Sequence, residues 1–389
     1  MAQSGLKVTG VDINKELIER IRTRKLDLSE PGLEEALTEA LESGRFEVST
    51  DIPEAHAYVI AVPTPFKDRN EFDSSFVDAA VDSISPKLRK GSLVILESTV
   101  PPRTTERLSV RVLSNRPDLV GENNEPLVMF AHCPERILPG NALAELKEND
   151  RVIGGMTPEA SQAAADLYKS FCSGDLLITD DRTAELTKLT ENAFRDVNIA
   201  FANELSIVCD SLSVDVWELI GLANHHPRVN ILQPGPGVGG HCIAVDPWFI
   251  VSAAPDKTRL IRTAREVNDS KVNWVVNRVT ESTKQYDAPT ITLFGLSFKA
   301  DIGDLRQSPS VRIAEKLIKT LPQARINVVE PHIKSVPSTI QDVSLVDLQT
   351  GMDEADIAVL LVDHTAFKSV EKAALAGTTI IDTKGLWAH

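Results

Sequence analysis

The sequence has 389 residues, which predicts two or three domains with enough apolar residues for a core in each. Hydrophobic residues make up 42% and charged residues 25%, as in globular proteins, and no apolar run reaches the ~18–20 residues that span a membrane. The formal net charge of -15 disfavours nucleic acid and anionic membranes as partners, so an anionic ligand would need a local cluster of Arg and Lys.

The cysteine pattern bears on compartment and on metal binding. Cys133, Cys172, Cys209 and Cys242 are far apart, and no two of them form a C-x-x-C pair. We therefore expect no disulfide framework, no metal site and a reducing, cytoplasmic location. The N-terminus has no basic segment followed by an apolar one, so we expect no secretory signal.

The first half of the chain alternates short apolar strands with helical patterns. Strands are expected at residues 7–14, 57–62, 93–96, 127–131 and 176–179, with helices at 15–23 and 32–43 and in most later intervals. This alternation predicts a mostly parallel, doubly wound α/β sheet. The strand at 7–14 ends near Asp12, where a Rossmann domain places the acid that binds the adenosine ribose of NAD. An ordinary helix N-cap region would look similar.

A single long helix is expected from residue 183 to about residue 211. Its apolar residues recur at helical spacing: Leu186, Leu189, Ala193, Val197, Ala200, Phe201 and Val208. More helix follows at 214–222 and 260–284. Such a helical region serves either as a dimer interface or as an internal core, and both remain open. After a linker at 285–289, strands at 290–294, 325–329, 357–362 and 379–382 predict a second, smaller α/β domain.

Small hydroxyl residues follow two of the expected strands, in the segments AVPTP at 61–65 and ESTVP at 97–101. Ligands of open α/β sheets bind beyond the carboxyl ends of strands, where a hydroxyl can hydrogen-bond a cofactor or a reacting oxygen. Turn and cap chemistry explains the same residues equally well.

Lys188, Asn192 and Arg195 lie at i, i+4 and i+7 and therefore share one face of the long helix. Such a face is commonly just solvated; the alternative is an edge that binds an anion and a carbonyl group. Other polar or aromatic residues of ordinary appearance could join it: His226, Arg228, Asn230, Phe298, Lys299, Asp304 and Arg306.

The most unusual segment is residues 234–247, PGPGVGGHCIAVDP, in which four glycines and three prolines surround Cys242. Glycine loosens the backbone and proline removes donors, so the segment is expected to be a shaped loop. It contains the letters G-x-G-x-x-G, but no apolar strand precedes them, so we reject a dinucleotide turn here. Cys242 is either a nucleophile or a small buried apolar residue. His241 is its sequence neighbour, and neighbouring side chains usually point apart.

Together these residues resemble the UDP-glucose/GDP-mannose dehydrogenase family over almost the whole chain. The resemblance rests on eight motifs: GVDIN at Gly10, AVPTPF at Ala61, ESTVPP at Glu97, CPERILPG at Cys133, NDRVIGG at Asn149, ELTKLTENAFRDVNIAFANE at Glu185, HPRVNILQPGPGVGGHCIAVDPW at His226 and GLSFKADIGDLRQSP at Gly295. It is strongest to the branch that oxidises UDP-N-acetyl-D-mannosamine for the enterobacterial common antigen, a polysaccharide.

The resemblance implies a four-electron oxidation of a sugar C6 alcohol to a carboxylate, with two NAD per turnover. An aldehyde must first form a tetrahedral adduct before a second hydride can leave, and a thiolate supplies one. By position, the implied nucleophile is Cys242, and Glu135 is the implied base for thioester hydrolysis. The resemblance also implies that Lys188 stabilises the oxyanion or moves a proton, that Asn192 and Thr99 hold the oxygen or a water, and that Asp246 tunes Lys188 and Cys242. Relatives that act on UDP-glucose often have a second glutamate where this chain has Pro139.

The resemblance also implies ligand contacts, a fold and a homodimer. The implied substrate contacts are Arg136, Ile137, Lys188, Asn192, Arg195, His226, Arg228, Gly239, Phe298, Lys299 and Lys384, and the implied NAD contacts are Asp12, Thr64, Thr99, Thr105 and Arg306. The implied fold has two Rossmann-like domains with parallel sheets, joined by an all-helical dimerisation region. We place the domains at 1–182, 183–285 and 286–389.

Two departures from the family pattern stand out. Arg103 replaces a glycine that often follows ESTxP. The family's first strand and its G-x-G-x-x-G turn are absent ahead of Asp12, so we expect an incomplete N-terminal sheet with unpaired edges and suspect that the start codon is assigned too late. The alternatives are another nucleotide sugar (UDP-glucose, UDP-N-acetylglucosamine or GDP-mannose) and a chain that binds a nucleotide sugar without catalysis.

Overall fold

The computed structural model describes residues 1–25, 30–67, 71–137, 140–240 and 242–387, and not the side chain of Lys372. Pro139 and His241, which the sequence analysis singled out, lie outside the described residues. The chain packs as two compact units, Met1–Thr190 and Glu191–His389. The three-domain boundaries at 182 and 285 stay a prediction.

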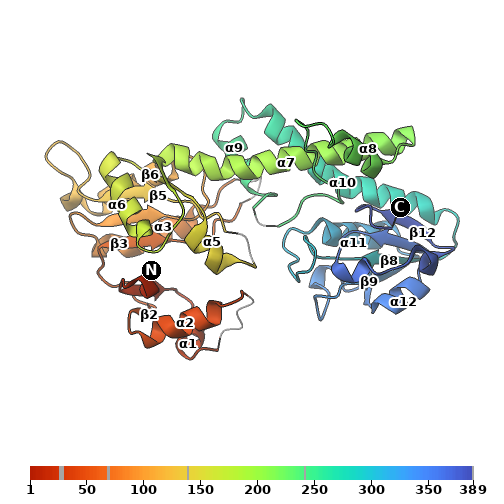
Figure 1. Cartoon of the computed structure of the whole chain (residues 1–389), viewed down its shortest axis with the longest axis horizontal. Coiled ribbons are helices and arrows are strands. Elements are labelled where there is room, and N and C mark those ends of the chain that lie inside the picture. The colour runs from red at the N-terminus through yellow and green to blue at the C-terminus, as the bar shows by residue number, and fades with distance from the viewer. Residues whose placement is uncertain (26–29, 68–70, 138–139, 241, 388–389) are drawn as a thin grey trace. The chain divides into compact units, whose positions relative to one another are not determined.

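The first unit begins with a small, separate layer, drawn in red and orange in Figure 1. β1 (Val8–Val11) and β2 (Phe46–Ser49) form a two-stranded parallel sheet in which Val8 is opposite Phe46. The short 3-10 helix η1 (Ala2–Ser4) precedes β1, and the helices α1 (Lys15–Arg22) and α2 (Leu33–Glu42) connect the two strands. The side-chain oxygen of Asn14 accepts the N–H groups of Glu16 and Leu17, which is why α1 begins there.

The main sheet of the first unit has the order β3-β4-β5-β6-β7. Its strands are β3 (Ala57–Ile60), β4 (Leu93–Leu96), β5 (Met129–His132), β6 (Arg151–Gly155) and β7 (Leu176–Asp180). The α-helices between them are α3 (Ser75–Ile84), α4 (Thr104–Asn115), α5 (Ala142–Glu148) and α6 (Pro158–Lys169), with 3-10 helices η3 (Ser85–Lys87) and η4 (Pro117–Leu119). All neighbouring pairs are parallel except β5 and β6, which run antiparallel. The sheet is therefore not parallel throughout.

The expected incompleteness of the N-terminal sheet is confirmed. Within the described ranges, β1 pairs with β2 alone and β3 pairs with β4 alone, so each has one edge without a neighbouring strand. The exposure of Val59 on β3, at 37%, and of Val11 on β1, at 40%, is a consequence of these open edges.

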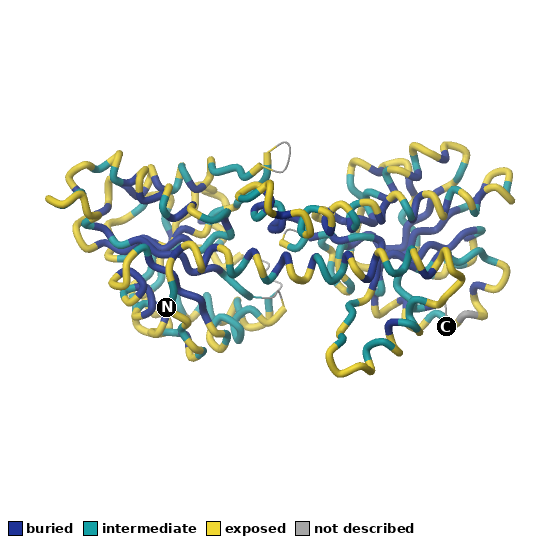
Figure 2. Tube along the Cα trace, turned by 90° about the horizontal axis from the view of Figure 1, so that it is seen from above, coloured by how far each residue is buried: buried dark blue, intermediate teal, exposed yellow. Residues whose placement is uncertain are grey.

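The second unit contains a complete parallel sheet with the order β10-β9-β8-β11-β12. Its strands are β8 (Thr290–Phe294), β9 (Arg325–Val329), β10 (Ser344–Leu345), β11 (Ile357–Leu360) and β12 (Thr379–Asp382). The accompanying helices are α11 (Pro309–Thr320), α12 (Leu348–Asp353), η5 (Ser338–Ile340), η6 (Thr365–Phe367) and η7 (Lys372–Leu375). Buried Ile, Leu and Val from β8, β9, β11, α10 and α11 form one core, which appears as the dark blue centre of this unit in Figure 2.

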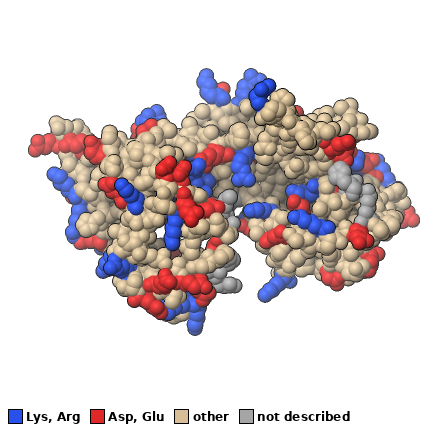
Figure 3. Space-filling view, viewed as in Figure 1, with Lys and Arg blue, Asp and Glu red and all other residues tan. Residues whose placement is uncertain are grey.

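Four helices without strands make up the middle of the chain: α7 (Asp181–Leu212), α8 (Val216–Ala223), α9 (Asp246–Ala253) and α10 (Arg259–Thr283). The expected apolar stripe of α7 divides into two sides. Leu189, Ala193 and Ala200 are buried, whereas Phe201 and Val208 are exposed. The described residues include no helix that is both long and apolar enough to cross a membrane. Acidic and basic side chains are intermixed over the face drawn in Figure 3.

Candidate functional site

The cysteine loop, residues 234–245, leads from the helical region into α9, and the structure places Cys242 at its exposed end. The other three cysteines are buried. The carbonyl oxygen of Cys242 accepts the N–H groups of Val245 and Asp246, at 3.1 and 2.8 Å, which forms the turn into α9. Cys242 therefore lies one turn before the start of α9 and is exposed.

A buried polar pair lies next to this turn. Asn192 on α7 and Asp246 on α9 are both more than nine-tenths buried, and Nδ2 of Asn192 donates to Oδ2 of Asp246 at 2.5 Å. Lys188 lies one helical turn before Asn192 and is partly exposed. The sequence did not predict this hydrogen bond between Asn192 and Asp246, and the catalytic roles of Lys188, Asn192 and Asp246 stay predictions.

The start of the cysteine loop is anchored to the long helices. The N–H of Gly235 donates to Oδ1 of Asn203 on α7 at 2.8 Å, and Nδ2 of Asn203 donates to Asn268 on α10 at 2.8 Å. Asn268 in turn donates to Asp196, whose carboxylate also pairs with Arg265 at 2.6 Å. These buried bonds fix the backbone that leads to Cys242.

The end of the cysteine loop packs against residues 295–308, which follow β8. A Cβ atom on Gly239 would lie 2.7 Å from Cβ of Phe298, and one on Gly240 would lie 2.8 Å from the Phe298 ring, so only glycine fits at these positions. The N–H of Gly240 donates to the carbonyl of Arg306 at 3.1 Å. Of the residues predicted to bind ligands, Gly239, Phe298 and Arg306 therefore come together beside the cysteine loop.

Arg306 and Cys242 are coupled electrostatically. Nε and one terminal nitrogen of Arg306 donate to Asp304, and this pairing raises the pKa of the guanidinium. The negative charge of a Cys242 thiolate raises it further, against the opposing effect of desolvation. The Arg306 guanidinium and the Cys242 thiol are therefore within electrostatic range of each other.

Glu330, which the sequence analysis did not identify, anchors the 295–308 loop through hydrogen bonds. Its buried carboxylate accepts the N–H groups of Leu296, Ser297 and His332. Nδ1 of His364 accepts the N–H of Asp301, so the ring proton lies on Nε2, which is 3.1 Å from Glu330. Burial raises the pKa of the Glu330 carboxyl, but the bonds from His364 and Leu296 outweigh burial and lower it to about 2.

Asp301 of this loop, His332 after β9 and His364 after β11 form a group of described residues that could hold a metal ion, with ligand atoms within 4.8 Å of one another. Two of the three residues already accept hydrogen bonds within the protein: both carboxylate oxygens of Asp301 accept from Thr365, and Nδ1 of His364 accepts from the N–H of Asp301. We therefore interpret the group as a loop anchor.

The first unit carries a second set of predicted residues at the carboxyl edge of its sheet. Thr64 follows β3, Thr99 follows β4, and Glu135, Arg136 and Ile137 follow β5. Oε1 of Glu135 accepts the N–H groups of Arg136 and Ile137, and Oε2 lies 3.4 Å from Arg151. These predicted residues are all partly exposed.

Thr105, predicted to contact NAD, lies deeper. It is buried, and both its N–H and its hydroxyl donate to Oε1 of Glu185 at 2.7 Å. Burial raises the pKa of Glu185 to about 7, although these hydrogen bonds oppose the increase. Glu185 lies three residues before Lys188 on α7, so it is a neighbour of the predicted site that sequence reasoning did not identify.

The remaining predicted contacts are spread over the second unit. His226, Arg228, Arg195 and Lys299 are exposed, and Nδ1 of His226 accepts the N–H of Arg228. Lys384 pairs with Asp363 at 3.1 Å, and its Nζ would lie 3.9 Å from a Cβ atom on Gly235. Lys384 is therefore close to the cysteine loop, whereas no hydrogen bond or ion pair among the described residues of that loop links it to His226 or Arg228.

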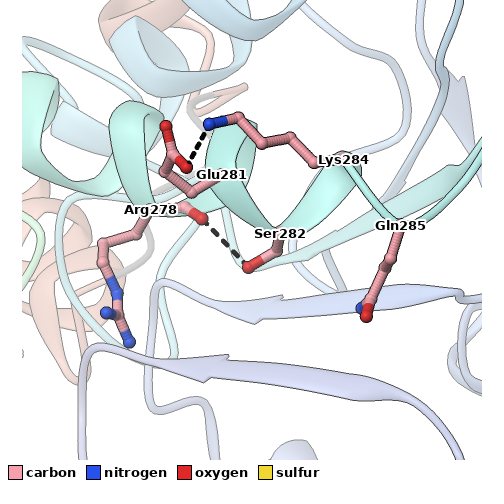
Figure 4. A pocket seen from close by; sticks show the side chains of 5 residues that line it. All are labelled: Arg278, Glu281, Ser282, Lys284 and Gln285. Atoms are coloured by element: carbon pink, nitrogen blue, oxygen red, sulfur yellow. Dashed lines mark hydrogen bonds and ion pairs between the residues drawn. The ribbon is translucent and has the colours of Figure 1, made fainter.

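Two surface hollows are lined by other residues. One, of about 460 Å³, is lined by Arg278, Glu281, Ser282, Lys284 and Gln285 at the end of α10, as Figure 4 shows. It is formed by adjacent turns of one helix and its lining contains no predicted site residue. A second hollow, of about 200 Å³, is lined in part by Lys271, Trp274 and Trp217 and likewise contains none of them.

The first unit fits part of an NAD molecule. Asp12, exposed after β1, could bind the ribose, and Thr64 and Thr99, which follow the neighbouring strands β3 and β4 of the main sheet, could hydrogen-bond the cofactor or a reacting oxygen. In the part of the chain that the structure describes, no glycine-rich turn precedes β1. The described residues before β1 therefore do not supply an element that binds the pyrophosphate.

Comparisons with known proteins agree with this arrangement. Three domains of the UDP-glucose/GDP-mannose dehydrogenase family match the chain: the NAD binding domain at residues 1–172, the central domain at 182–270 and the UDP binding domain at 292–389. The chain therefore belongs to this family of NAD-dependent nucleotide-sugar dehydrogenases.

Individual relatives are similar over almost their whole length. The chain is 51% identical to an NDP-N-acetyl-D-galactosaminuronic acid dehydrogenase of Ralstonia nicotianae, covering 100% of this chain and 92% of that protein. It is 50% identical to a UDP-N-acetyl-D-mannosamine dehydrogenase of Yersinia pestis, covering 98% and 93%. The structure of a UDP-N-acetyl-mannosamine dehydrogenase from S. aureus superimposes with a TM-score of 0.87 at 39% identity, covering 100% and 91%.

Proposed function

We propose that this chain oxidises the C6 alcohol of UDP-N-acetyl-D-mannosamine to the carboxylate, through a thiohemiacetal and a thioester on Cys242. The observation that carries the proposal is the exposure of Cys242 alone among the four cysteines, at the end of a rigidly anchored loop. Relatives that are named for this substrate and are about half identical support the choice of sugar.

Bound NAD would accept a hydride from C6 in each of the two oxidations. Between them, the Cys242 thiolate adds to the aldehyde carbon and forms the tetrahedral adduct from which the second hydride leaves. Lys188 stabilises the developing oxyanion or moves its proton, while Asn192 and Thr99 hold the oxygen or a water molecule. Asp246 orients Asn192, and Glu135 takes the proton of the water that hydrolyses the thioester.

The stoichiometry of NADH tests the proposal. Two NADH per UDP-N-acetyl-D-mannosamine are expected from the native protein, and Cys242→Ser should lower the rate of acid formation by a factor of about 10³ or more. Cys209→Ser is the matched control, because that cysteine is buried on α7. One NADH per sugar, or unchanged turnover of Cys242→Ser, would contradict the thioester mechanism.

A second candidate is another nucleotide sugar. The observation in its favour is the 51% identity to a relative named for N-acetyl-D-galactosaminuronic acid. UDP-N-acetyl-D-mannosamine, the N-acetylgalactosamine and N-acetylglucosamine nucleotides, UDP-glucose and GDP-mannose should be compared by kcat/KM. A higher value for any sugar other than UDP-N-acetyl-D-mannosamine would reassign the substrate.

A third candidate is nucleotide-sugar binding without catalysis, favoured by the open edges of β1 and β3. Calorimetric titration separates it from the first proposal. Micromolar binding of NAD would refute the non-catalytic candidate, whereas binding of the UDP-sugar alone would support it.

We also propose that the protein works as a homodimer in the cytoplasm. Phe194, Phe201 and Val208 recur every seven residues on α7 and are 68%, 55% and 44% exposed, an apolar seam suited to a second copy of the same helix. Sedimentation should show a dimer that Phe201→Glu dissociates. Val110→Glu, at an exposed apolar residue of α4, is the control and should leave it intact.

A further inference from the structure

One buried guanidinium serves two carboxylates at the carboxyl edge of the first unit's sheet. The side chain of Arg151 is 4% exposed. One terminal nitrogen lies 3.4 Å from Oε2 of Glu135, and the other lies 3.8 Å from Oε1 of Glu97. Its Nε has no hydrogen-bond partner among the described residues. Apart from a long bond to the carbonyl of Leu146 at 3.5 Å, the described partners of this cation are these two acids.

The antiparallel direction of β6 explains how Arg151 reaches this edge. Arg151 is the first residue of β6, and because β6 runs against β5, its first residue lies where β5 ends. The rings of Tyr168 and Phe171 lie 5.0 and 5.7 Å from the guanidinium carbon and shield it. With little water to screen it, the charge of Arg151 acts strongly on both acids.

Glu97 competes with Glu135 for this charge. The hydroxyl of Tyr168 donates to Oε1 of Glu97 at 2.8 Å, the oxygen that faces Arg151. Burial raises the pKa of the Glu97 carboxyl, the negative charge of Glu135 raises it further, and the Tyr168 bond and Arg151 oppose the increase. Glu97 and Glu135 thus share the charge of Arg151, and each carboxylate reduces the electrostatic stabilisation that Arg151 gives to the other.

We propose that Arg151 is a positioning residue that holds the carboxylate of Glu135 in place as the base for thioester hydrolysis, and that Glu97 weakens this hold by sharing the same guanidinium. This inference rests on the proposed function. In the step concerned, the water oxygen bonds to the thioester carbon and its proton passes to Glu135. The carbon–sulfur bond then breaks, which returns the Cys242 thiolate and releases the acid.

The other titratable groups around Glu135 do not change charge near neutral pH. Burial raises the pKa of the Cys133 thiol to about 12 and that of the Tyr168 hydroxyl well above its usual value, so both stay neutral. Arg136 is permanently charged and donates to the carbonyl of Asp150. The inference therefore concerns the charges of Arg151 and Glu97 alone.

The pH dependence of hydrolysis gives two shifts of opposite sign. Arg151→Gln removes a positive charge, so the acid limb of the hydrolysis rate should move to higher pH by about one unit or more. Glu97→Gln removes a negative charge, so the limb should move to lower pH by about half a unit. Arg151→Lys keeps the charge and should restore most of the native profile. Shifts of the same sign, or no shift with Glu97→Gln, would overturn the inference.

The covalent intermediate separates this inference from the proposed function. During turnover with UDP-N-acetyl-D-mannosamine and NAD, intact mass should show acyl-enzyme on Cys242 in Glu135→Gln and in Arg151→Gln. Acyl-enzyme in Glu135→Gln but not in Arg151→Gln contradicts the role of Arg151. No adduct in any variant contradicts the proposed function instead. If Arg151→Gln does not fold, the shift of the acid limb to lower pH in Glu97→Gln still tests the inference.

Discussion

Glu97 and Glu330 occupy the same place in two different sheets, and their surroundings push their acidities in opposite directions. Each directly follows a strand, β4 or β9, and each side chain is largely buried. Burial raises the pKa of Glu97, whereas that of Glu330 is lowered to about 2. Glu97 faces a second carboxylate, but Glu330 is surrounded by donors.

Glu185 is an intermediate case that shows which factor decides. It accepts N–H groups from Arg103 and Thr105, yet burial raises its pKa to about 7, and the nearby Asp181 adds to the increase. Two N–H donors and the Thr105 hydroxyl therefore do not offset burial at this position. Glu330 additionally receives a proton-bearing imidazole nitrogen, which identifies the His364 contact as the difference.

The largest expected effect is that of Glu330→Gln. The amide removes the charge and one acceptor oxygen from the buried donors around it, so the second unit should lose about 3 kcal/mol of unfolding free energy. All four tryptophans, Trp217, Trp248, Trp274 and Trp387, lie in this unit, so urea unfolding followed by tryptophan fluorescence reports on it specifically. A loss below about 1 kcal/mol would contradict the role of Glu330.

Lowering the pH should show how much the Glu330 carboxylate stabilises the native protein. Because the pKa of Glu330 falls from 4.5 to about 2 on folding, its stabilisation is full above pH 4.5 and disappears as the pH falls through about 2. This contributes a loss of about 3 kcal/mol across that interval. The fluorescence-monitored unfolding free energy should show it, and Glu330→Gln should have a shallower slope. Parallel slopes would argue against the assignment.

Glu97→Gln should have the opposite, smaller effect. A carboxyl with a raised pKa loses stability as the pH rises above 4.5, and a neutral amide avoids this loss while still accepting the Tyr168 bond. We expect a gain of about 1 kcal/mol at pH 8 that vanishes toward pH 4.5. Calorimetry of the first unit's unfolding at both pH values tests it. A loss at pH 8 would show that the charge of Glu97 is needed.

The smallest effect is expected at Arg103, whose N–H donates to Glu185. Its φ of 74° lies in the left-handed region that glycine adopts without strain, in agreement with the glycine often found there in the family. Arg103→Gly keeps the N–H donor and should stabilise the first unit by roughly 0.5–1 kcal/mol. Arg103→Ala is the control, because it removes the side chain without relieving the backbone, and should give no such gain.

The exact bounds of four strands, β4, β8, β9 and β12, could be predicted because their apolar runs end sharply. β6 was missed because its sequence, RVIGG, begins with a charge and ends in two glycines. The structure explains the glycines, since a Cβ atom on Gly154 would lie 2.2 Å from a carbonyl of β7. β2 was missed because FEVS is short and contains a charged residue.

The candidate site likewise contains residues that could be predicted from the sequence and residues that could not. The cysteine loop could be predicted, because its glycines and prolines permit little else. Glu330 and Arg151 could not, because their partners lie far along the chain or in another strand, as with Leu296 and Glu330, which are 34 residues apart. Such contacts leave no local pattern. Only the packing of neighbouring strands brings them together.

The small β1–β2 sheet has a consequence for how the protein opens. Two strands joined only to each other make few cooperative hydrogen bonds, whereas β4 is hydrogen-bonded on both sides and buried along its whole length. Amide hydrogens of β1 and β2 are therefore expected to exchange with solvent long before those of β4. Proteases should likewise find their first native-state cleavage sites around these two strands, while the rest of the first unit is still folded.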